Sequence, residues 1–283
     1  MSKFFNQTMR SREATLADQG FAIAGLQQEI ATEPQGTPAV AEAEPVLPVI
    51  EAAPKVDIPA SRLLPGRFAG SNSIKSAEES YRALRTRLMR LTAARNLRSI
   101  VITSSVPGEG KTLTSLNLAL CCSQLHDMRV LLVDGDIRTS GLTRNLGFTS
   151  HVGLADVLSG KSTAEAAILE SNHPNLYVCG SGSSNVPAPE LYAGESWPEF
   201  MAWCKESFSL VILDSPPIMT MADVELMTAA CDGVLMVVRA RHTRRDELQK
   251  SAGRIDGKKL LGIIYNAGDG ARHNYYYAGP KEK

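Results

Sequence analysis

The chain has 283 residues, of which 43% are hydrophobic and 21% charged, the composition of a globular protein of one large or two modest domains. Thirty Lys and Arg residues balance thirty Asp and Glu residues, and this net charge of zero argues against bulk nucleic-acid binding. No apolar run approaches the roughly 18 residues that span a bilayer. Residues 1–20 also lack the apolar stretch of a secretory signal. The five cysteines form no CxxC pair, which favours reduced and buried thiols.

The zero net charge is the sum of two differently charged regions. Residues 1–60 carry four Lys or Arg and eight Asp or Glu, a net charge of −4, and the remainder carries +4. Residues 1–30 have a loosely helical apolar pattern, which fits either a docking helix for a partner or a partly disordered leader. Residues 31–65 are rich in Pro, Ala and Glu and predict an extended linker. We therefore expect the folded domain over 66–266 and a flexible tail over 267–283.

The chain beyond residue 66 alternates helical and strand patterns. A helix is predicted from Ser76 through Leu91, then a strand over Ser99–Ser104, a Gly-rich turn and an apolar helix from about Leu113 to Leu125. Further strands are predicted over Val130–Asp134, Leu176–Cys179, Leu210–Asp214, Val234–Val238 and Leu260–Tyr265. Near-continuous runs of Val, Ile and Leu are typical of strands buried on both faces of a parallel sheet. The predicted fold is thus α/β, a mostly parallel sheet flanked by helices.

The turn between the first strand and the apolar helix carries the strongest motif. Its sequence, SVPGEGKT, matches the phosphate-binding pattern GxxxxGK[ST], except that Ser105 replaces the first glycine. Gly108 and Gly110 allow a tight turn whose backbone N–H groups point at phosphates. Lys111 is expected to reach the β- and γ-phosphates, and the Thr112 hydroxyl to bind Mg²⁺. The residues predicted to bind phosphate are Ser105, Val106, Pro107, Gly108, Glu109, Gly110, Lys111, Thr112 and Leu113. This context predicts a fold of the P-loop NTPase type.

Two further strands end in carboxylates. One ends in Asp134 and is followed by Gly135 and Asp136, and another ends in Asp214. Because ligands bind at the carboxyl ends of strands in open parallel sheets, both motifs are expected at the edge that carries the phosphate loop. A lone Asp-x-Asp pattern fits a solvated turn or a helix cap equally well. Two such strand ends beside a phosphate loop favour a catalytic site.

The trio SSVPGEGKT, LLVDGDIR and VILDSPP resembles the Walker A, Walker A′ and Walker B signatures of the bacterial tyrosine kinases, or BY-kinases. The arginine of DxDxR, Arg138, and the proline pair after the third aspartate are both present. BY-kinases are P-loop enzymes associated with capsule and exopolysaccharide synthesis. Related P-loop ATPases that position septa or partition plasmids usually carry a lysine early in the loop, where this chain has Val106. The resemblance covers roughly residues 66–283.

The resemblance implies an enzyme that transfers phosphate from Mg-ATP to tyrosine, with ATP and Mg²⁺ as cofactors. Asp214 is expected to hold the metal directly or through water. Asp134 is the first choice for the base and Asp136 supports the metal, although these two roles could be exchanged. Arg138 is expected to orient the carboxylates or to neutralise transferred charge. The expected catalytic residues are Lys111, Asp134, Asp136, Arg138 and Asp214, and the expected metal ligands are Thr112, Asp136 and Asp214.

Two flanking features extend the resemblance. Glu79, Arg82 and Arg85 resemble the family's ExxRxxR helix, which mediates contact between neighbouring subunits, although a solvated face with internal ion pairs explains the same spacing. Near the C-terminus, Tyr275, Tyr276 and Tyr277 resemble the family's autophosphorylation cluster. These features predict a homo-oligomer, such as a ring, whose subunits phosphorylate one another's tails.

The remaining expectations concern the base, the partners and the cellular place. Asn266 ends the last predicted strand and is expected to contact adenine, and because Ala267 replaces the lysine of the guanine-reading NKxD pattern, ATP is favoured. The resemblance implies a membrane-embedded polysaccharide co-polymerase as activator, a cognate tyrosine phosphatase and a cytoplasmic protein recruited to the membrane by its partner. Two alternatives stay open, a P-loop ATPase switch and a nucleotide-binding regulatory subunit without tyrosine transfer.

Overall fold

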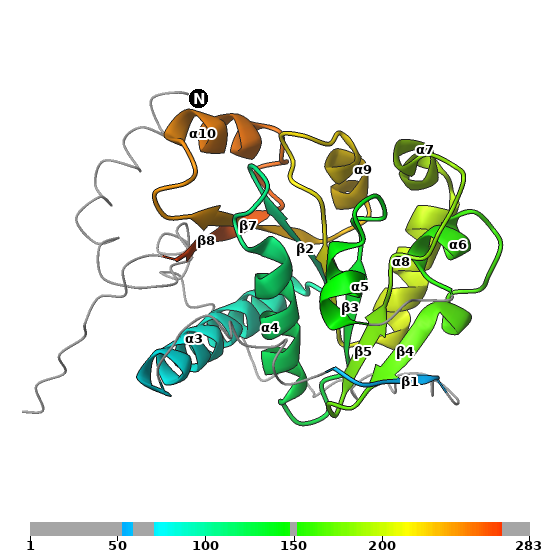
Figure 1. Cartoon of the computed structure of the whole chain (residues 1–283), viewed down its shortest axis with the longest axis horizontal. Coiled ribbons are helices and arrows are strands. Elements are labelled where there is room, and N and C mark those ends of the chain that lie inside the picture. The colour runs from blue at the N-terminus through cyan, green and yellow to red at the C-terminus, as the bar shows by residue number, and fades with distance from the viewer. Residues whose placement is uncertain (1–52, 59–70, 148–151, 268–283) are drawn as a thin grey trace, which may run out of the picture.

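The structure, a computed structural model, describes residues 53–58, 71–147 and 152–267. The strands of these residues form one eight-stranded sheet in the order β1-β4-β5-β3-β6-β2-β7-β8 (Figure 1). The strands are β1 (Lys55–Val56), β2 (Ser99–Ser104), β3 (Val130–Asp134), β4 (Ile168–Ser171), β5 (Leu176–Cys179), β6 (Leu210–Asp214), β7 (Gly233–Arg239) and β8 (Leu260–Asn266). The helices are α3 (Ser71–Arg95), α4 (Lys111–Ser123), α5 (Gly141–Leu146), α6 (Leu154–Leu158), the 3₁₀ turn η2 (Glu165–Ala167), α7 (Ala188–Ala193), α8 (Ser196–Ser207), α9 (Asp223–Ala229) and α10 (Arg245–Gly253).

The sheet is parallel from β5 to β8, as the sequence predicts, and antiparallel only where β4 meets β5. Strand β1 then pairs with β4 in parallel at the sheet edge. The bounds of β2, β3, β5 and β6 coincide with the predicted ones. Strand β4 was not predicted because it is short and half-exposed, without the apolar run of the central strands. Strand β1 lies within 31–65, the segment predicted as a linker, so the sheet includes residues that precede residue 66.

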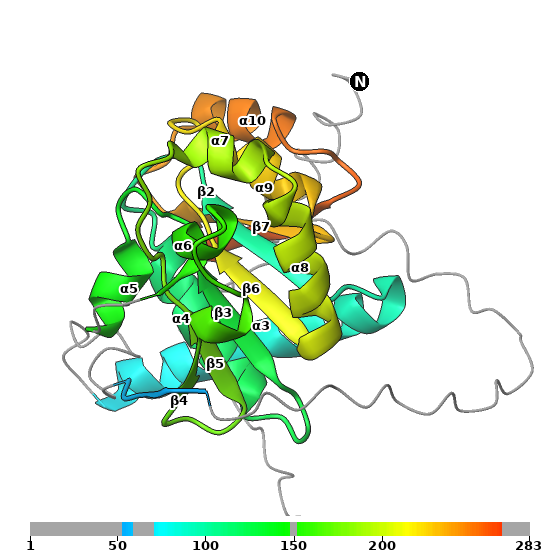
Figure 2. The ribbon, with the colours of Figure 1, turned by 90° about the vertical axis from the view of Figure 1, so that its right-hand side faces the viewer.

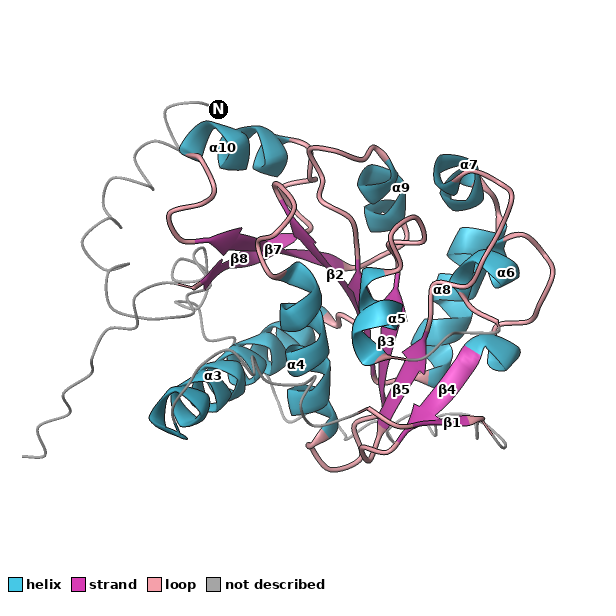
Figure 3. Cartoon of the chain, viewed as in Figure 1, coloured by secondary structure: helices cyan, strands magenta, loops and turns pink. Residues whose placement is uncertain are grey.

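Helices cover both faces of the sheet (Figures 2 and 3). Helices α3, α4 and α5 pack on one face, in a buried cluster with the side chains of Ile100, Leu132 and Ile212. Helices α6 to α10 pack on the other face, in a cluster that includes Val101 and Leu213. Successive residues of the central strands therefore belong to opposite clusters, which explains why their sequences are apolar without interruption.

The five cysteines are buried free thiols in this structure, as the sequence predicts. Burial raises the pKa of the Cys121 thiol, with Arg85 opposing, and raises that of Cys122, which disfavours the reactive thiolate at both positions. Among the described residues, no helix is both long and apolar enough for a transmembrane span.

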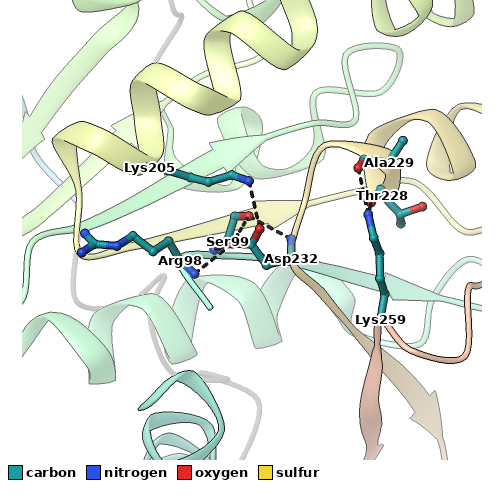
Figure 4. A network of polar contacts seen from close by, with 7 residues as sticks. All are labelled: Arg98, Ser99, Lys205, Thr228, Ala229, Asp232 and Lys259. Carbon is teal, nitrogen blue, oxygen red and sulfur yellow. Dashed lines mark hydrogen bonds and ion pairs between the residues drawn. The ribbon is translucent and has the colours of Figure 1, made fainter. Parts of the chain in front are cut away.

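A network of hydrogen bonds and an ion pair links neighbouring elements at the amino ends of the parallel strands, on the opposite side of the sheet from their carboxyl ends (Figure 4). The carboxylate of Asp232, just before β7, accepts the backbone N–H groups of Arg98 and Ser99, each at 2.9 Å, at the start of β2. The ammonium group of Lys205, on α8, also donates a hydrogen bond to this carboxylate, with Nζ 2.9 Å from Asp232 Oδ1. The network fixes β2, β7 and α8 relative to one another.

Candidate active site

The carboxyl ends of three adjacent strands form the site. Strand β6 lies between β2 and β3, and the phosphate loop follows β2. Asp214 ends β6 and Asp134 ends β3, and these two residues are register partners in the sheet. The three motifs that the sequence places at one edge are thus side by side in the fold.

The phosphate loop takes the turn that its glycines permit. Gly108 has φ of 82° and Gly110 has φ of 93°, both in the left-handed region that glycine favours. Gly110 caps the N-terminus of α4, and a Cβ there would overlap the side-chain amide of Asn266. Lys111 and Thr112 form the first turn of α4, so the positive end of the helix dipole faces the loop. This geometry suits an anionic phosphate.

A buried carboxylate inside the phosphate loop fixes its shape. The side chain of Glu109 is fully buried. One of its oxygens accepts the N–H of Val106 at 2.9 Å, which closes the loop on itself. The other accepts the hydroxyl of Thr243, which lies between β7 and α10. The buried carboxylate of Glu109 therefore stabilises the shape of the loop from within and is not a surface charge.

Two strand ends hold the same loop from outside. The guanidinium of Arg239, at the end of β7, donates to the Gly108 carbonyl at 3.1 Å. The amide of Asn266, at the end of β8, donates to the Glu109 carbonyl at 2.8 Å. Asn266, for which the sequence predicts an adenine contact, lies at the phosphate loop with its amide nitrogen bonded to the loop backbone. Arg239 and Thr243 were not predicted as site residues, because neither belongs to the phosphate-loop motif or to an acidic strand end.

Asp214 is a fully buried carboxylate beside the phosphate loop. Burial raises its pKa to about 7, whereas the charge of Lys111 and the nearby hydroxyls of Thr112 and Ser115 oppose that rise and the charge of Asp134 adds to it. The Ser115 hydroxyl donates to its Oδ1 at 3.1 Å. Its Oδ2 is buried and has no hydrogen-bond partner among the described residues.

That unpartnered oxygen fits the expected magnesium site. An orphaned buried carboxylate oxygen is costly unless a ligand satisfies it. Mg²⁺ at phosphate-binding sites commonly uses one or two carboxylates, waters and substrate phosphates. In the described part of the chain no group of three or more His, Cys, Asp or Glu could hold a metal, and this sparse kind of site needs none. Asp214 and the neighbouring Thr112 hydroxyl are therefore suitable ligands.

Asp134 is also fully buried, but both of its oxygens have protein donors. Its Oδ2 accepts the N–H and the hydroxyl of Thr143, from α5, at 2.8 and 2.7 Å. Its Oδ1 accepts the N–H of Asp136 at 3.2 Å. Burial raises the pKa of Asp134, the bonds from Thr143 oppose the rise, and the charge of Asp136 adds to it. Thr143, which the sequence did not mark, thus orients the carboxylate that ends β3.

Gly135 joins the two acidic motifs through its backbone. Its N–H donates to the Asp214 carbonyl at 2.8 Å. A Cβ at Gly135 would lie 2.8 Å from that same oxygen, so the close approach requires glycine. On its other side, the Gly135 carbonyl accepts the hydroxyl of the fully buried Tyr192, from α7, at 2.7 Å. Tyr192 therefore supports the segment between Asp134 and Asp136.

Arg138 is paired with an acid that the sequence did not single out. Its guanidinium donates to both carboxylate oxygens of Asp223, at the start of α9, with a shortest distance of 2.9 Å. The Asp223 side chain is only 2% exposed, and that of Arg138 is 42% exposed. The N–H of Thr139 donates to Asp136 Oδ1 at 3.1 Å. In this structure Arg138 thus anchors the segment after β3 to α9.

The remaining predicted residues lie away from the phosphate loop or outside the described residues. On α3, Arg82 pairs with Glu79 at 3.4 Å and with Glu78 at 3.7 Å, and Arg82 is half-exposed. Arg85 donates to the Cys121 carbonyl of α4 at 2.8 Å. The three tyrosines of the tail, over 275–277, lie outside the described residues.

Comparison with known proteins agrees with this site. Residues 97–251 match the protein family described as "AAA domain". The chain is 33% identical over 207 residues to the tyrosine-protein kinase YwqD of Bacillus subtilis, covering 72% of this chain and 87% of YwqD. It is 31% identical over 205 residues to the tyrosine-protein kinase CpsD of Streptococcus pneumoniae, covering 71% and 89%.

A solved structure shows the same fold. The kinase domain of the Escherichia coli tyrosine kinase ETK superposes with a TM-score of 0.67 at 25% identity, covering 84% of this chain and 95% of that domain. The P-loop, the two acidic strand ends and these relatives converge on one assignment. The chain therefore belongs to the bacterial tyrosine-protein kinases and is a P-loop enzyme of that class.

Proposed function

We propose that the chain is an ATP-dependent autokinase that phosphorylates Tyr275, Tyr276 and Tyr277 of its own tail. One observation supports this proposal most directly. Asp134 and Asp214 lie opposite each other in the sheet, at the carboxyl ends of β3 and β6 and beside the phosphate loop. One carboxylate can then hold the metal while the other accepts a proton. A tyrosine cluster near the C-terminus supplies the acceptor hydroxyls.

The proposed mechanism rests mainly on positioning and charge neutralisation. The loop N–H groups and Lys111 bind the phosphates of ATP, and Thr112 and Asp214, assisted by Asp136, would hold Mg²⁺. The bound ion would neutralise negative charge on the transferred phosphoryl group. The tyrosine oxygen attacks the γ-phosphorus, the bond from phosphorus to the β,γ-bridging oxygen breaks, and ADP leaves.

The tyrosine proton passes to a carboxylate in this mechanism. A tyrosine hydroxyl has a pKa near 10, so its attack benefits from a positioned acceptor. Asp134 is the first choice, since burial raises the pKa of its carboxylate and thereby strengthens it as a base. To distinguish it from Asp136, Mg²⁺ titrations of nucleotide binding should compare Asp134→Asn with Asp136→Asn. A larger loss of Mg²⁺ affinity in Asp134→Asn would exchange the two roles.

The contact between subunits is proposed to use the exposed part of α3. Glu79 and Arg82 face solvent, whereas Arg85 bonds to α4 and would link a subunit contact to the helix that carries the phosphate loop. A mixing assay tests transfer between chains. Lys111→Met chains, which carry intact tails, are incubated with chains whose three tail tyrosines are Phe. Phosphotyrosine on the Lys111→Met chains supports transfer in trans, and its absence contradicts it.

The wider role is proposed from the family resemblance. We expect the chain to regulate exopolysaccharide or capsule synthesis with a membrane-embedded co-polymerase as activator and a tyrosine phosphatase as antagonist. It would then be a cytoplasmic protein recruited to the membrane by its partner. A fluorescent fusion tests the recruitment, since it should reach the membrane only when the activator is co-expressed. Membrane labelling without the activator would refute this dependence.

Phosphopeptide mass spectrometry after incubation with Mg-ATP tests the central proposal. Wild-type protein should carry phosphate on the tail tyrosines, and Lys111→Met should carry none. The Tyr275/Tyr276/Tyr277→Phe variant should lose the tail signal while still binding nucleotide. ATP hydrolysis without phosphotyrosine would instead identify an ATPase switch. Competition between labelled ATP and unlabelled GTP tests the proposed adenine contact of Asn266.

A further inference from the structure

The edge strand β4 is covered by a short extended segment from far upstream, Pro54–Ile58. The two segments are more than a hundred residues apart in the sequence and pair in parallel, with Lys55 opposite Glu170. The Pro54 carbonyl accepts the N–H of Glu170 at 2.9 Å. The Val56 carbonyl accepts the N–H of Asn172 at 3.1 Å. An edge strand offers this row of backbone groups to any extended chain that reaches it.

Asn172 extends the pairing beyond the end of β4. Its side-chain Oδ1 accepts the N–H of Ile58 at 3.0 Å. Its Nδ2 donates to the Ile58 carbonyl at 3.4 Å and also contacts the Asp57 carboxylate. One amide side chain thus satisfies both backbone groups of Ile58, as a neighbouring strand would. Such contacts recognise the extended main chain rather than a particular side chain.

Side-chain specificity comes from alternate positions of the docked segment. Lys55 and Asp57 are exposed, Val56 is half-buried and Ile58 is fully buried. Ile58 belongs to the buried cluster that also contains Leu132 and Val178. The alternation is that of a strand with one face on the protein. The site therefore suits an extended peptide with aliphatic residues at every second position.

We infer that the β4 edge and Asn172 form a strand-docking site whose occupant is the chain's own Pro54–Ile58 segment. Docking there ties the acidic N-terminal region to the kinase domain at the sheet edge remote from β8. Twelve residues separate Ile58 from α3, and they can span up to about 40 Å, enough for docking within one chain. The site is independent of the proposed kinase mechanism, because none of its residues contributes to the phosphate loop or to its acidic strand ends.

Hydrogen exchange in the full-length protein tests the docking. The N–H of Glu170 is the reporter, because the Pro54 carbonyl accepts its hydrogen bond. Ile58→Ser, which empties the apolar position, and Asn172→Ala, which removes the amide, should each speed its exchange about ten-fold or more. The matched control Asn185→Ala, at an exposed position before α7, should leave it unchanged. Unchanged exchange at Glu170 in both docking variants would overturn the inference.

The backbone amides of the central strands show whether a variant destabilises the whole core instead of only the docked segment. Exchange at Leu132 and Ile212 should stay slow in every variant, because β3 and β6 are fully buried. If those amides also exchange faster, Ile58 is an integral part of the core and not a docked side chain. That outcome would refute a separable docking site.

Disulfide trapping identifies the occupant. Lys55 and Glu170 are register partners, so Lys55→Cys and Glu170→Cys in one chain should form a disulfide within that chain. The five native cysteines are buried and do not compete. A mixture of the two single variants should give no cross-linked pair of chains. Efficient cross-linking in that mixture would show instead that a second copy of the chain supplies the segment.

Discussion

Replacing Asp232 with alanine should destabilise the whole domain without touching the phosphate loop. The Asp232 carboxylate holds the start of β2 through the N–H groups of Arg98 and Ser99 and the hydroxyl of Ser99, at 2.9, 2.9 and 3.0 Å. It also holds Lys205 of α8 at 2.9 Å (Figure 4). The substitution removes all four bonds at once and leaves backbone N–H groups of β2 without their acceptor.

The contacts set the magnitude. A hydrogen bond to a charged group contributes about 1.5–3 kcal/mol when buried and less when water reaches it. The Asp232 and Lys205 side chains are 27% and 28% exposed, so each bond should contribute at the low end of that range or below. Water also replaces part of what is lost. We therefore expect Asp232→Ala to lower the free energy of unfolding by about 2–4 kcal/mol.

Urea unfolding followed by circular dichroism measures this loss. Asp246→Ala is the matched control, because Asp246, in the first turn of α10, forms an exposed ion pair with Arg244, which precedes the helix. Such pairs contribute little to stability, so the control should keep the wild-type midpoint. Nucleotide binding of folded Asp232→Ala should equal that of the wild type. A midpoint for Asp232→Ala that matches the control would refute the reasoning.

The pH dependence gives a second check on the same residue. Burial tends to raise the pKa of Asp232, but the hydrogen bond and charge of Lys205, the N–H of Arg98 and the hydroxyl of Ser99 lower it overall. A carboxyl whose pKa is lowered by folding stabilises the folded state above its unfolded pKa, about 3.9. The stability difference between wild type and Asp232→Ala should be constant from about pH 5 to 8 and should shrink as the pH falls below about 4. A difference that persists at low pH would contradict the charge-dependent part of the argument.

Two further substitutions test the supports of the acidic segment after β3. Tyr192→Phe removes the hydroxyl that donates to the Gly135 carbonyl at 2.7 Å. It should lower the free energy of unfolding by about 1–3 kcal/mol. It should also raise the Mg²⁺ concentration needed for nucleotide binding, which calorimetry measures. Tyr177→Phe, at a half-buried position that contacts Phe208, should leave the Mg²⁺ requirement unchanged, and an equal shift in both variants would contradict the role of Tyr192. Gly135→Ala forces a Cβ to 2.8 Å from the Asp214 carbonyl and should abolish Mg-nucleotide binding or lower the melting temperature. Gly253→Ala, whose Cβ would meet nothing within 4 Å, should do neither, and wild-type behaviour of Gly135→Ala would show that the backbone can move apart.

The sequence by itself determined the central sheet and the place of the site. Runs of β-branched and aliphatic residues marked β2, β3, β5 and β6 with the bounds that the structure has. Each of these strands is buried on both faces, so burial left a continuous apolar signal. The phosphate loop and the acids that end β3 and β6 followed from local motifs and from the rule that parallel strands present their carboxyl ends at one edge. Those motifs span only a few residues each, which is why a single sequence reveals them.

Only the tertiary structure decided which side chains support that site. Thr143 donates to Asp134, and Arg138 donates to Asp223. Each of these contacts joins two elements whose residues are too far apart in the sequence for a local motif to reveal the pair. An acid at the first turn of a helix, such as Asp223, has a sufficient local explanation in the helix dipole. The close approach of Gly135 to the Asp214 carbonyl was likewise not predicted, because nothing in the sequence around Gly135 names the neighbouring strand end.

The edge of the sheet was equally out of reach of the sequence. Strand β1 has two residues and β4 has four, and the pattern around them is short and partly polar. Their pairing depends on backbone hydrogen bonds. Every residue type can make such bonds, although proline can only accept them, so the pairing imposes no residue pattern. The sequence therefore determined the motifs that are local and the strands that are buried on both faces. The fold alone decided the long-range contacts, because backbone pairing and buried polar partners leave no periodic trace in a chain.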